Sequence, residues 1–418
     1  MKKLVISGGR PLGGSIDLQG SKNSALPILS AAVAVNGISV IHNCPDLTDV
    51  TAALKILEHI GCKTVREGHT VIIDSSTACR HNIPEWLMHE MRSSIVFLGA
   101  LLARFGEATV SSPGGCEIGL RPIDLHLSAL RSMGAEISES GGRLECRAKN
   151  GIRGCRISLS FPSVGATENV MLAAVCAKGE TVITNAAREP EIADLACFLN
   201  KCGARIKGAG QSVIRISGVN RLESAEHGII TDRIVASTYM SCAALTGSEI
   251  AVKGVIPEHL APVIPVFEAA GCNVKISKNE LVIDAQSGIH RVKYIRTMPY
   301  PGFPTDSQAI VMAMLAKAEG TSIVSEKIFE NRFRHVPELI KMGADIRIED
   351  GCIAVVEGVS RLHGAKVSAG DLRGGCALAA AALGAEGKTV IDEIHHIDRG
   401  FENIERSLSL LGADIKRE

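Results

Sequence analysis

Aromatic side chains are scarce in this 418-residue chain, and neither sign of charge is in excess. Phe, Trp and Tyr make up 3% of the residues, against 46% for all hydrophobic types, so the cores must be built from Ala, Val, Ile and Leu. Lys plus Arg equal Asp plus Glu at 45 each, which excludes bulk electrostatic attraction to nucleic acid or to an anionic membrane. Any basic site must therefore be local.

Long apolar runs and paired cysteine motifs are also missing. The longest apolar stretches, such as residues 25–35, are too short to span a bilayer. None of the 13 cysteines forms a C-x-x-C pair, and the chain opens with a folded-looking KKLVISGG segment. We therefore expect a cytoplasmic protein from a reducing compartment, with no nucleic-acid or membrane partner.

An internal repeat organises the sequence. A phrase with a central glycine recurs six times, as EHIGC, RSMGAEI, NKCGARI, EAAGCNV, IKMGADI and SLLGADI, and its glycines are about 70 residues apart. A second glycine, followed by a β-branched run such as GETVI or GTSIV, precedes each phrase by about 25 residues. Two landmarks that keep in step six times indicate six copies of one structural unit.

Each copy has the pattern of a helix, a strand, a second helix and one or two more strands. The first helices, such as ENVMLAAVCA, are apolar or small on all sides, which predicts complete burial. The second helices, such as HVPELIKMG, are amphipathic and end at glycine. We predict an α/β (α+β) fold of two domains with three units each, with helices inside and sheets outside.

The domain boundaries are predicted at two chain connections, near residues 20 and 230. Residues 21–230 would form the N-terminal domain, and residues 1–20 with 231–418 the C-terminal domain. The sixth unit ends at ADIKRE, one strand short, and the N-terminal MKKLVISGG resembles the missing piece. We therefore expect Lys3 to Ser7 to pair with strands of the C-terminal half.

Polar residues recur where the first helices begin and in the loops that lead to the second helices. Helix N-termini carry unpaired N–H donors and a positive dipole end, so several of them converging on one cleft would suit phosphates. Asp232 and Asp371 fit equally well as plain helix caps, and Lys22 as part of a solvated first turn. The two sets are Ser21, Lys22, Asn23, Arg92, Ser163, Gly165, Thr167, Asp232, Arg233, Thr305, Asp306, Asp371 and Arg373, then Cys116, Arg121, Arg188, Glu330, Arg332, Asp398 and Arg399.

The loop SPGGCEIGLRP, residues 112–122, is the most distinctive segment of the chain. A cysteine in an apolar run is usually a small core residue, but a glycine-rich loop brings backbone close to ligands and keeps side chains accessible. Arg121 lies five residues after Cys116 and would favour the thiolate, the reactive form of cysteine. Cys116 is therefore a candidate reactive group.

These segments together resemble the UDP-N-acetylglucosamine 1-carboxyvinyltransferases, enolpyruvyl transferases of the EPSP synthase superfamily that open bacterial peptidoglycan synthesis. The resemblance implies two inside-out α/β domains that close over a central cleft holding the active site. It also implies phosphoenolpyruvate and UDP-N-acetylglucosamine as substrates, with no cofactor and no metal. The matching segments are GSKNSALPIL, MRSSIVFLGALLARFG, PGGCEIGLRPIDLHL, PSVGATEN, PYPGFPTD, FENRFRHVPEL, DLRGG and HHIDRGFENIE.

The resemblance also implies roles for individual residues. Cys116 would contact phosphoenolpyruvate and deliver a proton to its methylene carbon, and Asp306 would lie near the sugar 3-hydroxyl as a candidate base. The implied catalytic residues are Cys116, Asp306, Lys22 and Arg399. The implied substrate-binding residues are Lys22, Asn23, Arg92, Arg121, Pro122, Ile123, Asp124, Leu125, Ser163, Val164, Gly165, Asp306, Ile328, Arg332, Asp371, Arg373 and Arg399.

Two departures from the family pattern leave alternatives open. Phe161 stands where some members have a lysine near the diphosphate, and the stretch TDRIVASTYM differs from the usual PDRIEAGT at Thr231, Val235 and Ser237. The chain could therefore transfer enolpyruvyl to a different nucleotide or nucleotide sugar. EPSP synthase itself lacks the PGGC loop, and a non-catalytic nucleotide-sugar-binding paralogue would be expected to have lost one of Cys116, Asp306, Lys22 and Arg399.

Overall fold

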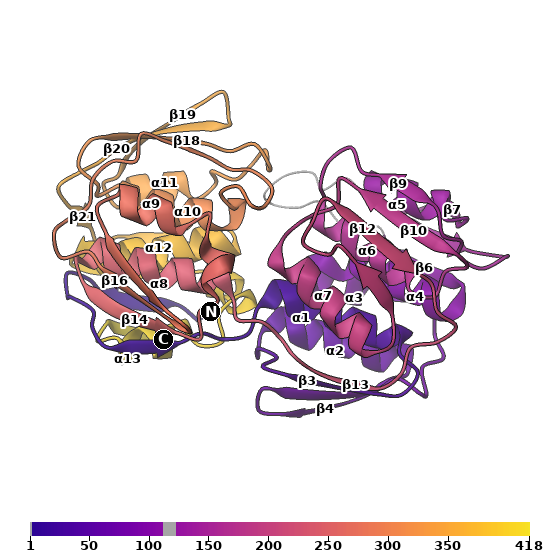
Figure 1. Cartoon of the computed structure of the whole chain (residues 1–418). Helices are drawn as coiled ribbons and strands as arrows, with labels where there is room; N and C mark the ends of the chain where they lie inside the picture. The colour runs from indigo at the N-terminus through magenta and orange to yellow at the C-terminus, as the bar shows by residue number, and fades with distance from the viewer. Residues whose placement is uncertain (1, 112–122) are drawn as a thin grey trace. The chain divides into compact units, whose positions relative to one another are not determined.

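The computed structural model describes residues 2–111 and 123–418. Cys116, Arg121 and Pro122 of the predicted site lie outside the described residues. The described residues form two compact units (Figure 1): the first unit, residues 20–111 and 123–230, and the second unit, residues 2–19 and 231–418. The chain passes between the units after Gln19 and again after Ile230.

Three sheets lie outside the buried helices of the first unit. Their strand orders are β13-β3-β5-β4, β6-β8-β7 and β11-β12-β10-β9. The pairs β13 with β3 and β9 with β10 are parallel, whereas the other pairs in these sheets are antiparallel. The strands are β3 (Ile38–His42), β4 (Lys63–Glu67), β5 (Thr70–Asp74), β6 (Glu107–Ser111), β7 (Glu136–Ser140), β8 (Arg143–Arg147), β9 (Arg156–Ser158), β10 (Glu180–Thr184), β11 (Arg205–Lys207), β12 (Val213–Ser217) and β13 (Ala225–Gly228).

The second unit repeats this plan. Its larger sheets have the strand orders β15-β16-β14-β2, β17-β18-β20-β19 and β22-β24-β1-β25, and β21 pairs with β23. The strands are β1 (Leu4–Ser7), β2 (Ser15–Asp17), β14 (Glu249–Lys253), β15 (Asn273–Ser277), β16 (Glu280–Asp284), β17 (Tyr294–Arg296), β18 (Thr321–Ser325), β19 (Asp345–Glu349), β20 (Ile353–Glu357), β21 (Leu362–His363), β22 (Lys366–Ser368), β23 (Ala385–Glu386), β24 (Lys388–Asp392) and β25 (Asp414–Arg417).

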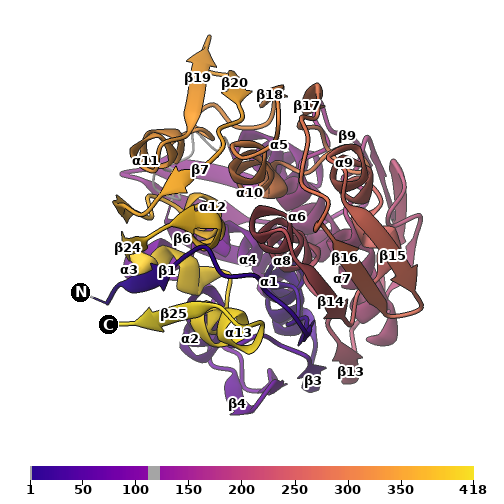
Figure 2. The same ribbon diagram turned by 90° about the vertical axis from the view of Figure 1, so that its left-hand side faces the viewer.

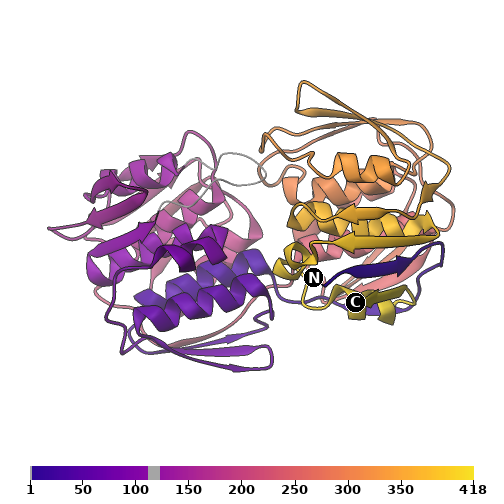
Figure 3. The same cartoon turned by 180° about the vertical axis from the view of Figure 1, so that it is seen from behind.

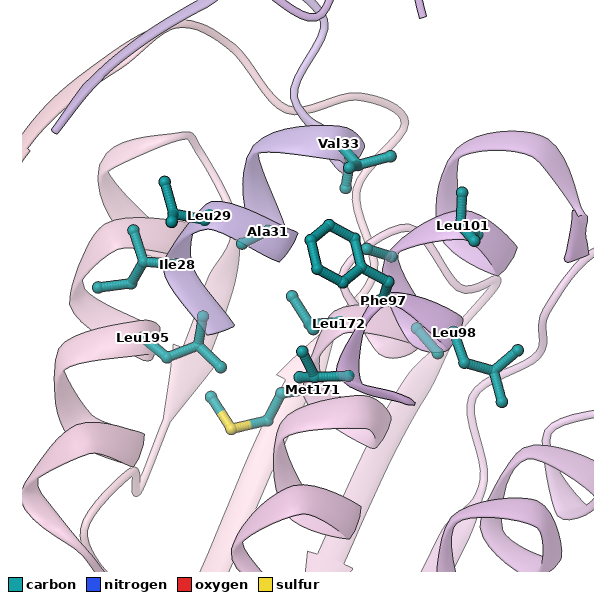
Figure 4. Close-up of a cluster of buried hydrophobic side chains, with 14 of the residues drawn as sticks. Ile28, Leu29, Ala31, Val33, Phe97, Leu98, Leu101, Met171, Leu172 and Leu195 are labelled. Atoms are coloured by element: carbon teal, nitrogen blue, oxygen red, sulfur yellow. The ribbon is translucent and has the colours of Figure 1, made fainter. Parts of the chain in front are cut away.

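The core of each unit is built around three helices rich in small and apolar residues. All 13 residues of the last of these helices, α12, are buried. In the first unit, Figure 4 shows Leu29, Phe97 and Leu172 from three different helices in one cluster. The prediction of buried first helices is therefore confirmed. The six helices are α1 (Lys22–Ala31), α4 (Phe97–Phe105), α6 (Val164–Ala174), α8 (Arg233–Thr246), α10 (Thr305–Leu315) and α12 (Leu372–Gly384).

The remaining helices include the amphipathic second helices of the repeats. They are α2 (Thr48–Ile60), α3 (Glu85–Glu90), α5 (Asp124–Ser132), α7 (Pro190–Lys201), α9 (Ile264–Ala269), α11 (Val336–Lys341) and α13 (Ile404–Leu410), with the short 3₁₀ helices η1 (Ala32–Ala34), η2 (Arg92–Val96), η3 (Pro257–Leu260) and η4 (Ile394–Arg399). The six glycines of the repeated phrase follow α2, α5, α7, α9, α11 and α13, each with φ between 91° and 106°. Only glycine adopts this conformation without strain, which explains why it recurs.

Strand β1 completes the sheet of the sixth repeat. It pairs antiparallel with β24 on one side, with Val5 opposite Val390, and with β25 on the other, with Val5 opposite Lys416. Figures 2 and 3 show the indigo strand beside these yellow strands. The expectation that Lys3 to Ser7 would pair with the C-terminal half is therefore confirmed.

One lysine joins the ends of the three buried helices in the second unit. Lys317, just after α10, donates through Nζ to the carbonyl of Leu245 in α8 at 3.1 Å and to that of Gly384 in α12 at 3.0 Å. Burial lowers the pKa of Lys317. A cation near helix C-termini satisfies carbonyls that lack partners within their helices.

We predict that Lys317→Met lowers the unfolding free energy of the second unit by about 2 kcal/mol, because two charge-assisted hydrogen bonds are lost while the side-chain length is kept. Thermal and denaturant unfolding measure the change. Lys366→Met is the matched control, since that ammonium is exposed and pairs with a surface carboxylate. Equal melting temperatures for the two variants would contradict the role of Lys317.

Candidate active site

Helix α1 begins with two of the predicted site residues, Lys22 and Asn23. The Nζ atom of Lys22 lies 3.4 Å from Oδ2 of Asp49, in the first turn of α2, and both side chains are nearly buried. This ion pair fixes the direction of the ammonium group. Because the N–H groups of the first helical turn add positive potential, the start of α1 offers an oriented cation for an anionic ligand.

A second carboxylate, that of Asp194 in α7, holds the start of α1 from the other side. It accepts hydrogen bonds from the Ser24 hydroxyl, from Nε2 of His227 at 2.9 Å and from the backbone N–H of Ile230 at 3.3 Å. The N–H of Ser21 donates to the carbonyl of Ile230 at 2.8 Å. The first turn of α1 is therefore fixed to β13 and to the connection that follows it.

The starts of α5 and α6 bring two further groups of predicted residues together. Ser163 caps α6 by accepting the N–H of Ala166 at 3.3 Å, and Val164 and Gly165 form the first turn. Residues 123–125 open α5, and His126 follows in the same helix. A Cβ atom at Gly165 would lie 3.0 Å from Cε1 of His126, so a side chain larger than hydrogen would force the helices apart.

The tautomer of His126 follows from its hydrogen bonds. Asn169 accepts the N–H of Gly99 at its Oδ1 atom, 2.7 Å away, and donates from Nδ2 to the carbonyl of Ile95, 3.0 Å away. These bonds orient the amide so that Nδ2 also donates to Nδ1 of His126, at 2.8 Å. Burial lowers the pKa of His126 to about 4. At neutral pH the ring is therefore neutral, with its proton on Nε2 beside Gly165.

In the second unit, Asp306 lies between two buried arginines. Its Oδ1 atom is 2.7 Å from Nη2 of Arg332, and its Oδ2 atom is 2.9 Å from Nη2 of Arg373. Only 3% and 5% of the two arginine side chains is exposed, against 28% of Asp306. Arg332 also donates to the carbonyl of Thr305 through Nε and Nη2. A partly exposed carboxylate at the start of α10 is thus held in one direction by two cations.

Asp371 and Asp232 both act as helix caps. Oδ1 of Asp371 accepts the N–H groups of Arg373 and Gly374 at 2.9 and 3.1 Å, and Oδ1 of Asp232 caps α8 in the same way. The capping alternative that the sequence left open is therefore present for both. Desolvation acts to lower the pKa of Arg373, but the carboxylates of Asp306 and Asp232 raise it overall.

Two predicted arginines lie on short 3₁₀ segments. Arg92 begins η2, and Arg399 ends η4. The neighbour of Arg399, Asp398, forms a bidentate ion pair with Arg417 at 2.9 and 2.7 Å, and Arg417 also binds Glu405. The C-terminal strand β25 therefore supports the segment that carries Arg399.

Within each unit the structure brings part of the predicted set together. Asp306 contacts both Arg332 and Arg373 in the second unit. In the first unit, residues 123–125 form the cap and first turn of α5, which packs against α6, the helix that begins at Val164. The residues that support these groups were not singled out from the sequence: His126 and Asn169 lie within the matching segments PGGCEIGLRPIDLHL and PSVGATEN without an implied role, and the others stand outside any matching segment. These supporting residues are Asp49, His126, Asn169, Asp194, Glu326 and Arg417.

Metal-ligating clusters and membrane-spanning helices are both absent from the described residues. Within residues 2–111 and 123–418, no group of three or more His, Cys, Asp and Glu side chains is placed to hold a metal ion. No helix in this part of the chain is both long enough and apolar enough to cross a membrane.

Comparison with known proteins agrees with the fold described above. The family model described as EPSP synthase (3-phosphoshikimate 1-carboxyvinyltransferase) matches residues 6–408. The chain is 52% identical over 417 residues to UDP-N-acetylglucosamine 1-carboxyvinyltransferase 2 of Caldanaerobacter subterraneus subsp. tengcongensis, covering 100% of both chains. It is 47% identical over 421 residues to the UDP-N-acetylglucosamine 1-carboxyvinyltransferase of Myxococcus xanthus, again covering 100% of both.

Solved structures show the same fold. The enolpyruvyl transferase NikO from Streptomyces tendae is 25% identical with a TM-score of 0.89, and the match covers 100% of this chain and 98% of NikO. EPSP synthase from Acinetobacter baumannii is 18% identical with a TM-score of 0.75 over 100% of both chains, a likeness of fold alone.

A family model that matches nearly the whole chain defines a carboxyvinyltransferase of the EPSP synthase type. Within that class, the full-length identities of about 50% decide the branch. The chain belongs to the UDP-N-acetylglucosamine 1-carboxyvinyltransferase family. The predicted fold and the predicted family are both confirmed.

Proposed function

We propose that the chain transfers the enolpyruvyl group of phosphoenolpyruvate to the 3-hydroxyl of UDP-N-acetylglucosamine and releases phosphate. The observation that carries this function is identity of 46% to 52% over the full chain to relatives that bear the name of this activity. The oriented cation at α1 and the carboxylate held by two arginines at α10 are consistent with it. The first committed step of peptidoglycan synthesis is the corresponding cellular role.

The reaction divides into an addition and an elimination. The acceptor oxygen bonds to C2 of phosphoenolpyruvate, its proton passes to a base, and a proton is delivered to C3. The resulting tetrahedral ketal then loses phosphate as the C2–O bond to phosphate breaks, and a proton leaves C3 so that the double bond forms again. Both steps develop positive charge at C2, which nearby carboxylates stabilise, while cations hold the leaving phosphate.

Asp306 is proposed to act on the acceptor hydroxyl. Each carboxylate oxygen has two lone pairs, and the ion pairs with Arg332 and Arg373 use one on each oxygen. The side chain is 28% exposed, and we propose that the exposed part of the carboxylate accepts the hydrogen bond of a sugar hydroxyl. The arginines keep the carboxylate aimed at the hydroxyl, so that no conformational entropy is lost at the moment of reaction.

The remaining roles concern the two substrates. We propose that Cys116 delivers the proton to C3 and that Lys22, Asn23, Arg121 and Arg399 hold phosphoenolpyruvate, since a phosphate and a carboxylate together require several cations. Arg332, Arg373 and Asp371 would belong to the same ligand-bound site. The proposed contacts to the nucleotide sugar are Arg92, Arg121, Pro122, Ile123, Asp124, Leu125, Ser163, Val164, Gly165 and Ile328.

The setting of the reaction is also a proposal. We place the enzyme in the cytoplasm, where both substrates are water-soluble anions, and we propose phosphoenolpyruvate and UDP-N-acetylglucosamine as its ligands, without nucleic-acid or membrane partners. Residues 21–230 and residues 1–20 with 231–418 would act as its two domains.

A phosphate-release assay tests the function. Purified protein is given phosphoenolpyruvate and UDP-N-acetylglucosamine together, and each substrate is omitted in turn. We expect release only with both present, together with a product whose mass equals that of the nucleotide sugar plus the enolpyruvyl group. Phe161 is exposed close to the start of α6, at the position where some family members have a lysine near the diphosphate. The same assay with a panel of other nucleotide sugars therefore tests which acceptor the enzyme uses.

Each other outcome of this assay has a defined meaning. Release with a different nucleotide sugar alone would overturn the assigned acceptor, and release with shikimate 3-phosphate would indicate the EPSP synthase reaction. Binding of the nucleotide sugar without any release would indicate a non-catalytic paralogue.

A further inference from the structure

Glu326, which directly follows β18, is buried but lies outside the predicted site. Its Oε1 atom accepts hydrogen bonds from the hydroxyl of Thr297 at 2.8 Å, from the N–H of Ile328 at 2.7 Å and from the N–H of Phe329 at 3.2 Å. Its Oε2 atom accepts the hydroxyl of Thr305 at 2.9 Å. A buried carboxylate is unfavourable unless it is satisfied in this way.

The Oε2 side of this carboxylate leads to Asp306. Thr305 is the first residue of α10 and directly precedes Asp306. Glu326 holds the Thr305 hydroxyl, while Arg332 holds the Thr305 carbonyl at 3.2 and 3.0 Å from Nε and Nη2. The peptide that carries Asp306 is therefore fixed from two directions.

The Oε1 side leads to Ile328. The hydroxyl of Thr297 accepts the N–H of Lys327 at 2.9 Å and donates to Glu326, so three successive N–H groups, at positions 327–329, are all satisfied by these two side chains. The backbone at Ile328 is thus fixed by the same carboxylate that fixes the start of α10.

A purely structural role accounts for the burial and the satisfied bonds. It does not explain why Oε2 supports the start of α10, which carries Asp306, while Oε1 supports the backbone at Ile328. Asp306 is proposed to meet the sugar hydroxyl, and Ile328 is proposed to contact the nucleotide sugar. We infer that Glu326 is a positioning residue of the transfer reaction, which sets the distance and direction of Asp306 relative to Ile328. This inference rests on the proposed function.

The two sides of the carboxylate predict different kinetic effects. Loss of the Oε2 side displaces Asp306 from the acceptor hydroxyl, and a displacement of about 1 Å costs on the order of a hundredfold in rate. Loss of the Oε1 side loosens Ile328, which would weaken binding of the nucleotide sugar in the ground state and in the transition state alike.

The test uses isosteric variants, because removal of Glu326 itself threatens folding. Thr305→Val and Thr297→Val each delete one hydroxyl donor to the same carboxylate. We expect Thr305→Val to lower kcat by about tenfold or more with little change in KM for UDP-N-acetylglucosamine. Thr297→Val should raise that KM by about fivefold and leave kcat within about a factor of two. Thr305→Ser should restore kcat.

Two comparisons complete the experiment. Thr321→Val removes an exposed hydrogen bond from Thr321 in β18 to Glu357 in the neighbouring strand β20 and should leave both constants unchanged. The double variant Glu326→Gln/Thr305→Val should have a kcat no lower than that of the slower single variant. Both substitutions act through the same hydrogen bond between Thr305 and Glu326, so their effects should not add.

The outcomes separate this inference from the proposed function. A wild-type enzyme without phosphate release from the two substrates would remove the function. A wild-type enzyme with full activity, combined with threonine variants that change kcat and KM in parallel or not at all, would overturn the role of Glu326 and leave the function intact.

Discussion

Asp306→Asn is expected to lower turnover by roughly two to four orders of magnitude while both substrates still bind. Asparagine keeps the size of the side chain and one oxygen acceptor, but it loses the negative charge that makes Asp306 a proton acceptor. The amide nitrogen also faces a guanidinium group, which cannot accept a hydrogen bond. The rate loss should therefore appear in kcat, because the missing interaction belongs to the reacting hydroxyl.

The same substitution should change the response of the protein to anions. Arg332 and Arg373 are buried and lose their shared counter-charge in Asp306→Asn. Inorganic phosphate should then raise the melting temperature of the variant more than that of the wild-type protein, because it replaces the missing negative charge. Asp414→Asn removes a carboxylate from a largely exposed pair with Arg10 and is the control.

Steady-state kinetics, titration calorimetry with UDP-N-acetylglucosamine and thermal shifts in phosphate measure these effects together. Near-normal turnover would remove Asp306 from the mechanism. A variant that is inactive but binds phosphate no better than the control would contradict the ion-pair geometry around Asp306.

The fold was predictable because it repeats. Six glycines with φ between 91° and 106° follow the second helices, and any other residue type would be strained in that conformation. Glycine therefore recurs once in each repeat, which makes the repeat spacing visible in the sequence. The small residues of α6 and α12 likewise indicated burial on all sides. The position of β1 could be predicted by comparing the number of strands in each repeat, because the sixth repeat lacks one strand and β1 supplies it.

The supporting residues of the candidate site were not predictable in the same way. Lys22 and Asp49 are 27 residues apart, His126 and Asn169 are 43 apart, and Ser24 and Asp194 are 170 apart. Each is a single polar residue on a helix, where the sequence pattern gives only its face. Which carboxylate meets which cation is decided when sheets and helices pack, and one sequence alone carries no record of those pairings.

Cys116 is expected to be the cysteine that an epoxide phosphonate such as fosfomycin modifies. The thiolate sulfur would attack an epoxide carbon, the carbon–oxygen bond would break, and a thioether would form. Lys22, Arg121 and Arg399 are the proposed holders of the phosphonate, as they are of phosphate. A held electrophile reacts far faster than a free one, so bound UDP-N-acetylglucosamine should accelerate labelling by organising the same site.

The other cysteines are internal comparisons for the labelling of Cys116. Twelve lie in the described part of the chain, and none of these twelve is in a disulfide. Burial raises the pKa of Cys62, Cys146 and Cys272 to about 11 and that of Cys202 to about 12, which leaves almost no thiolate at neutral pH. Cys79 and Cys197 are exposed, so they are the internal controls for access without a phosphonate site.

Cys116→Ser should abolish labelling and lower turnover by roughly two to four orders of magnitude, because a hydroxyl is a far weaker acid than a thiol. Cys116→Asp keeps an acid at this position, so it should retain turnover while escaping the epoxide. Peptide mass spectrometry of the treated protein, with and without UDP-N-acetylglucosamine, measures the site and rate of labelling. An adduct mainly on Cys79 or Cys197, or labelling that ignores the nucleotide sugar, would refute the role of Cys116, because either result would show that exposure alone governs the reaction.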